Sequence, residues 1–169
     1  MTWGIPTPVF LQVHVALSLV GIATGLVAVF GMLNRRYLPV WTAVFLGTTL
    51  LTGVTGFPLP PFGLDPPRIV GIILICALVV AIVSLYLRSL GGVSRSAYVI
   101  CAVLSLYLNV FVAIAQSFQK IGPLHALAPT QSEPPFLVAQ IFALAVFIAI
   151  GFFAWRHFRP PFTKMPASA

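Results

Sequence analysis

The chain has 169 residues, of which 60% are hydrophobic and only 7% are charged, and its mean hydropathy is +1.08. Soluble domains carry about a quarter charged residues, so this composition excludes an aqueous fold and predicts a membrane protein surrounded by a lipid bilayer. The net charge of +7 comes from basic residues set singly or in pairs between apolar runs. Because they form no basic stripe with interleaved aromatics, nucleic acid is not expected as a partner.

Five apolar runs are long enough to cross a bilayer, which takes about 20 residues. A backbone in lipid must satisfy its own hydrogen bonds, so each run is predicted to be a helix. The first run lacks a basic segment before it and a cleavage site after it, and is read as a retained helix rather than a signal peptide. We therefore expect an all-α, polytopic bundle of five transmembrane helices, with 1–159 as a single domain and 160–169 as a disordered cytoplasmic tail. The predicted helices span 8–33, 39–57, 67–87, 97–118 and 135–155.

Lysine and arginine gather on one side of this predicted bundle, and cytoplasmic segments carry an excess of both residues. The bias predicts an outside N-terminus and a cytoplasmic C-terminus, in a multi-pass protein of the inner membrane if the source is bacterial. Only Arg68 and Lys120 lie on the outer side. The seven basic residues on the inner side are Arg35, Arg36, Arg88, Arg95, Arg156, Arg159 and Lys164.

The chain's two acidic residues, Asp65 and Glu133, each stand directly before a pair of prolines at the outer start of a predicted helix. Proline is tolerated in a first helical turn, and a carboxylate there meets the positive end of the helix dipole. Both acids are therefore predicted to be helix caps. The segment from Thr130 to Glu133 also fits a capping box, with partner docking as the alternative.

One face of the first predicted helix carries His14, Ser18, Gly21 and Gly25 at spacings of four, three and four. The two glycines allow close approach of a neighbouring helix, either within the bundle, which we favour, or in a homodimer. A histidine inside a membrane helix is a functional candidate. The alternative is a neutral imidazole that forms a hydrogen bond with a neighbouring helix.

The fourth predicted helix carries a polar or small stripe that includes Ser105, Asn109, Gln116 and Lys120. An unpaired amide near the bilayer centre costs several kcal/mol, so Asn109 must face protein or a water-filled cavity. On the second helix, threonines share a face and are expected to bond back to their own helix carbonyls.

These groups lie at similar depths and predict a polar pocket near the outer face. The pocket would bind a partner protein or a small lipophilic ligand without catalysing a reaction. The candidate ligand-binding residues are His14, Ser18, Thr52, Thr55, Asn109, Gln116 and Gln140.

Two other functions stay open. A redox component could hold a single haem or a quinone near His14, and the threonine face of the second helix would suit a small carrier or pore. No metal site is expected because no ligands cluster along the chain. Cys76 and Cys101 are predicted at different depths, too far apart for a disulfide. No cofactor is assigned, and enzymatic activity is not the favoured interpretation.

Overall fold

A computed structural model describes residues 1–59, 66–88 and 90–159. Helices make up 83% of this part of the chain. Asp65 and the predicted tail, 160–169, lie outside the described residues. Four stretches are long and apolar enough to cross a membrane, which supports the expected multi-pass helical protein. They are α1 (Thr7–Leu33), α3 (Pro66–Ile82) with its π-helical extension η1 (Val83–Leu87), α4 (Gly92–Lys120) and α6 (Pro134–His157).

The second predicted span is the helix α2 (Pro39–Gly56), which is shorter and less apolar than these four. Its 18 residues include five threonines and three glycines. Several of the hydroxyls donate back to the carbonyl four residues earlier, as in Thr48 to Val44 (2.7 Å) and Thr52 to Thr48 (2.9 Å). This pairing makes the hydroxyls compatible with an apolar environment.

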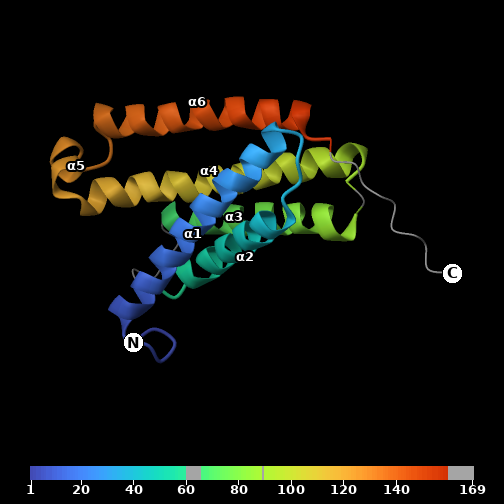
Figure 1. Ribbon diagram of the computed structural model, residues 1–169. Helices are drawn as coiled ribbons and strands as arrows, with labels where there is room; N and C mark the ends of the chain where they lie inside the picture. Colours follow the sequence, from blue (N-terminus) through green and yellow to red (C-terminus); the bar gives the residue numbers. More distant parts are fainter. Residues whose placement is uncertain (60–65, 89, 160–169) are drawn as a thin grey trace.

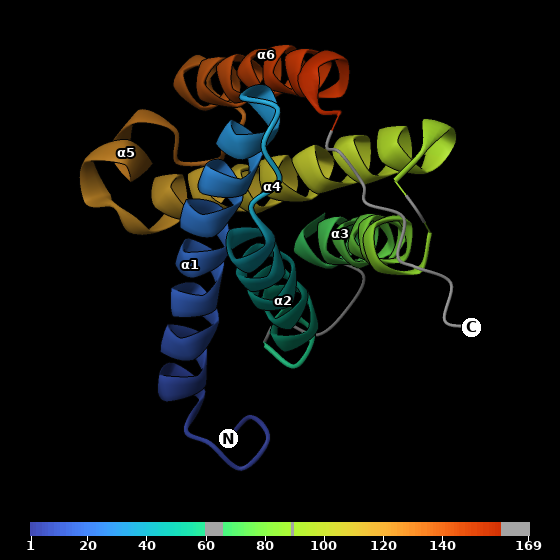
Figure 2. The same cartoon turned by 45° about the vertical axis from the view of Figure 1, so that its right-hand side comes forward.

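The helices form two groups that meet along α4. Figure 1 shows α6 and α3 running beside α4, while α1 crosses it at a steep angle with α2 alongside. The turned view in Figure 2 separates α2 and α3 and shows the N-terminal half of α1 projecting away from α6. The long helices α1, α3 and α6 thus meet α4 from different directions, and each places a different set of side chains against it.

The apolar core lies toward the end of the bundle where α1 ends and α4 begins. Its fully buried members include Phe45, Leu78, Tyr98 and Leu106. Toward the opposite end, residues 110–117 of α4 are all only partly buried. The two ends of the bundle therefore differ in how they are held together.

A tight turn joins α1 to α2 at the end where the core lies. The backbone N–H of Arg35 donates to the carbonyl of Met32 (3.1 Å), and that of Arg36 donates to Gly31 (2.8 Å). This is the Schellman pattern, in which the residue after the helix adopts a left-handed conformation, here Arg35 at φ 60°. A side chain at Gly31 would lie 2.9 Å from Leu38, so the turn needs that glycine.

The long connection between α4 and α6 contains a short helix, α5 (Gly122–Leu127), that the sequence did not lead us to expect. Pro123 lies in its first turn, where a missing N–H is tolerated. The remainder of the connection is tied to α4 because the side-chain amide of Gln131 donates to the Ala115 carbonyl at 2.7 Å. The fourth helix also begins five residues earlier than expected, at Gly92 rather than Ala97.

Candidate functional site

Three hydrogen bonds link α1 to its neighbours in the less densely packed half of the bundle, and the longest of them runs from Asn109 Nδ2 to the Ser18 carbonyl at 3.5 Å. His14 Nδ1 lies 2.9 Å from Thr55 Oγ1 on α2, and Ser18 Oγ donates to Asn109 Oδ1 on α4 at 2.9 Å. Four of the residues expected from the sequence are thus brought into direct pairs between helices. We call the region formed by His14, Ser18, Gly21, Thr55 and Asn109 the polar seam.

The partner of His14 determines which ring nitrogen carries the proton in the neutral imidazole. Thr55 Oγ1 donates its single hydrogen to the carbonyl of Leu51 at 2.7 Å. It can therefore only accept from His14, which must carry its proton on Nδ1. This leaves Nε2 as a hydrogen-bond acceptor with no partner among the described residues, on a side chain that is only partly buried.

Gly21 lies at the deepest point of the polar seam. A Cβ atom there would come within 2.8 Å of Thr49 Oγ1 and 3.2 Å of Asn109 Nδ2. Thr49 is fully buried, and its hydroxyl has no hydrogen-bond partner in the described part of the chain. The absent side chain of Gly21 therefore lets polar groups from α2 and α4 approach α1. Sequence reasoning did not single out Thr49, although its place beside Thr48 and Thr52 on α2 was a usable signal.

One turn further along α1, Gly25 makes an apolar contact of the same kind. A Cβ at Gly25 would lie 2.7 Å from Leu106 Cδ1 and 2.8 Å from Phe45 Cδ2. Both of these side chains are fully buried, so a side chain at position 25 would require the core around them to shift. Within the chain, the two glycines expected to allow helix packing thus lie against α2 and α4.

The remaining candidate residues differ in their placement. Thr52 is buried and bonds within its own helix, while Gln116 is half-buried on the same face of α4 as Asn109. Gln140 lies at a different interface, where its amide donates from α6 to the Phe111 carbonyl of α4 at 3.2 Å. Its Oε1 is buried without a partner among the described residues. Gln140 is therefore not joined to the polar seam.

Lys120 supplies a positive charge near the His14 end of the polar seam. It is exposed at the last residue of α4 and lies within electrostatic range of His14. His125 is exposed on α5, and His157 ends α6. In the described ranges no three histidine, cysteine or acidic side chains could hold a metal ion together, and both cysteines are free thiols.

Glu133 is the N-cap residue of α6, but its side chain makes no hydrogen bond to that helix. Its carboxylate instead accepts from the backbone N–H and the hydroxyl of Thr130 (3.1 and 2.9 Å) and from the N–H of Ser132 (3.1 Å). Partial desolvation raises the pKa of Glu133, but these hydrogen bonds outweigh it, and the net pKa is lowered. The bond to the Thr130 N–H resembles half of a capping box, formed within the connection rather than at the helix start.

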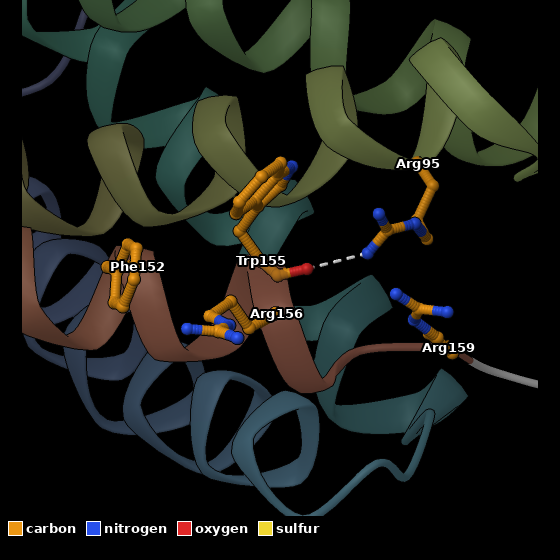
Figure 3. A pocket seen from close by; sticks show the side chains of 5 residues that line it. All are labelled: Arg95, Phe152, Trp155, Arg156 and Arg159. Atoms are coloured by element: carbon orange, nitrogen blue, oxygen red, sulfur yellow. Dashed lines mark hydrogen bonds between the residues drawn. The ribbon is translucent and has the colours of Figure 1, made fainter.

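A second feature lies at the other end of the bundle, where α6 ends beside the beginning of α4. Five side chains line an open pocket of about 280 Å³, which we call the arginine pocket (Figure 3). Sequence reasoning used its arginines only to assign orientation. The pairing of Arg156 and Arg159 beside Trp155 was a signal, but their approach to α4 could not be seen from the sequence. The lining residues are Arg95, Phe152, Trp155, Arg156 and Arg159.

Hydrogen bonds hold the wall of the arginine pocket in place. Arg95 Nη1 donates to the carbonyls of Trp155 (2.7 Å) and Phe158 (2.8 Å), which lie at the end of α6. The indole N–H of Trp155 donates to Ser96 Oγ on α4 at 2.9 Å. These contacts fasten the end of α6 to the first turns of α4.

Both features have to be interpreted from their own contacts. No protein-family model matches the chain, and comparison with the curated proteins and with the solved structures finds no similar protein. The conclusion is that the chain is a helical bundle with four candidate transmembrane helices, a polar seam at one end and an arginine pocket at the other.

Proposed function

We propose that this protein crosses the membrane five times and binds a small lipophilic ligand with a hydroxyl group in the polar seam, near the outer face. The observation that carries the proposal is the unpaired Nε2 of His14. A hydrogen-bond acceptor inside a membrane helix bundle is costly unless it finds a donor. A ligand hydroxyl entering from the outer leaflet would supply that donor.

The proposal takes α2 as the fifth span, with the N-terminus outside. Eighteen helical residues extend about 27 Å, close to the roughly 30 Å thickness of the hydrocarbon core. Threonines that bond back to their own helix lower the cost of placing α2 in lipid. An odd number of spans then agrees with the seven basic residues on one side and two on the other.

The surroundings of His14 favour a ligand that is apolar apart from one polar group. The seam's outer end is bordered by partly buried side chains of α4, whereas the dense apolar core lies at the other end. Gln116 and Lys120 add hydrogen-bond donors toward the membrane surface, where a carbonyl or a second oxygen of the ligand could bind. A phenol or quinol with an apolar tail has this distribution of groups.

The proposal can be tested with two probes that differ only in hydrogen-bond donation, 4-octylphenol and its methyl ether, 4-octylanisole. Thermal unfolding of the purified protein in mild detergent would be measured with each. The phenol should stabilise the native state by about 1.4 kcal/mol at ten times its dissociation constant. The ether, which has the same apolar body but no donor, should stabilise it much less.

Two histidine variants make the test specific. His14→Phe should abolish the difference between phenol and ether, because the acceptor is lost. His125→Phe is the matched control, since His125 is exposed on α5 and lies outside the polar seam. Equal stabilisation by phenol and ether, or an unchanged phenol response in His14→Phe, would contradict the proposal.

The unpaired Nε2 of His14 also favours a second candidate function, that of a redox component. Histidine nitrogen is the axial ligand of haem in many proteins, so a free Nε2 could hold a single haem in a redox component. The visible absorption spectrum of the purified protein separates the two functions. A Soret band in the wild type that disappears in His14→Phe would replace the first proposal with the second.

A further inference from the structure

We propose that the arginine pocket binds the phosphate group of an anionic phospholipid. The pocket is at the far end of the bundle from the polar seam, so this site does not depend on the ligand proposed for His14. Three of its five lining residues are arginines, and the other two are Phe152 and Trp155. Arginine forks match phosphate oxygens with two parallel hydrogen bonds, which makes this lining suited to a phosphate.

The protein itself has no carboxylate to neutralise these arginines within the described residues. Glu133, the one acid described, precedes α6, whereas Arg156 lies in the last turn of that helix. Their separation of 23 positions along the chain corresponds to about 34 Å of helix. Neither Arg156 nor Arg159 forms an ion pair with any described residue, so no described part of the chain supplies their counter-charge.

Figure 3 shows the guanidinium groups of Arg95 and Arg159 close to each other, with Arg156 on the other side of Trp155. Arg95 uses Nη1 to bind the end of α6, which fixes its position and leaves its other donors available. Arg156 lies over the ring of Phe152, 5.6 Å from its centroid. The like charges of Arg95 and Arg159, which lie close together, repel each other unless an anion binds between them.

The position of the pocket favours a lipid over a free phosphate ion. The face of α6 leading to it is apolar and exposed, with Ile148 63%, Phe152 49% and Phe153 50% accessible. Acyl chains could lie along this face while the headgroup reaches the arginines. Trp155, 42% exposed, has the character of a residue at the membrane interface. Basic pockets between helices at this surface are suited to anionic headgroups.

The experiment measures binding of phosphatidylglycerol to the full chain in detergent, with phosphatidylcholine and inorganic phosphate as comparison probes. The test variant is Arg156→Gln/Arg159→Gln. The matched control, Arg35→Gln/Arg36→Gln, removes the same charge from exposed arginines that do not line the pocket. The pocket variant should bind phosphatidylglycerol about 25-fold more weakly, and the control less than about fivefold.

A further variant, Arg156→Lys/Arg159→Lys, keeps the charge but removes the forked geometry, and should lose several-fold in affinity. It also keeps the test decisive if the glutamine variant does not fold. Equal losses in the pocket and control variants would show only diffuse surface charge and overturn the proposal. Inorganic phosphate binding as tightly as phosphatidylglycerol would assign the site to a soluble phosphate, and equal binding of phosphatidylcholine would remove the requirement for an anionic lipid.

Discussion

The polar seam and the arginine pocket both use α4, but they place polar groups in opposite ways. In the seam, Ser18 and Asn109 are neutral and pair with each other between helices. In the pocket, Arg95 is charged, lies at the end of the helix and faces an open space. About 21 Å of helix separates Arg95 from Asn109. The difference follows from depth, because a neutral pair can be buried among apolar helices whereas a guanidinium needs water, a headgroup or an anion.

The largest expected effect comes from filling the close contact of α1 at Gly25. Gly25→Val would come too close to Leu106 and Phe45, and because both side chains are fully buried, the core would have to shift to accommodate it. We expect a loss of about 2–3 kcal/mol in unfolding free energy, or failure to fold. Denaturation in mild detergent by added SDS, followed by circular dichroism, would measure it.

Gly47→Val is the matched control, because nothing lies within 4 Å of a Cβ atom at Gly47. Its stability should change by less than about 0.5 kcal/mol, as for other exposed substitutions. Similar losses at both glycines would show that the effect reflects helix propensity and not the approach of α2 and α4.

A smaller effect is expected from removing the hydrogen bond between the side chains of Ser18 and Asn109 in the polar seam. A double-mutant cycle with Ser18→Ala and Asn109→Leu should give a coupling energy of about 0.6–1.7 kcal/mol, the range for hydrogen bonds between membrane helices. Unfolding free energies of the four proteins in the same detergent supply the cycle. A coupling energy near zero would mean that the side-chain hydrogen bond between Ser18 and Asn109 does not stabilise the fold.

The corresponding change at the arginine pocket is Arg95→Gln, which removes the donor to the carbonyls of Trp155 and Phe158. Because these bonds are partly exposed, we expect a loss of only about 1 kcal/mol. Hydrogen exchange should become several-fold faster at residues 154–158 and stay unchanged in the first half of α6. The control is Arg88→Gln, an exposed arginine at the end of η1. Slower or unchanged exchange in Arg95→Gln would show that Arg95 does not hold the end of α6 in place.

The smallest effect concerns Glu133, at the end of α6 remote from the arginine pocket. Its native pKa is lowered, so its stabilising contribution is present above the unfolded pKa and is lost as the pH falls through the native pKa. The melting temperature of the wild type should exceed that of Glu133→Gln at about pH 6. The difference should shrink as the pH falls below the ordinary value of 4.5 and vanish once the pH is below the lowered native pKa. A difference that persists in acid would show that the carboxylate charge is not responsible.

Part of the site could be predicted from the sequence because helical periodicity places residues on faces. The spacing of His14, Ser18 and Gly21 put them on one side of α1, and the structure has all three facing α2 or α4. Periodicity does not say which neighbour each face meets. Gln140 was grouped with these residues by depth, yet it lies against α4 from a different direction. Two residues at the same depth in a bundle can therefore lie on opposite sides of it, and the sequence gives only the depth.

Composition and the order of apolar runs predicted a helical protein with several segments able to cross a membrane, because a backbone in lipid can satisfy its hydrogen bonds only within each segment, and four helices of the structure are long and apolar enough to do so. Tertiary structure decided what α1 touches, which tautomer Thr55 imposes on His14, and how Arg95 comes to lie beside the end of α6. These contacts depend on crossing angles and side-chain packing between segments far apart in the chain. No single run of residues contains that information.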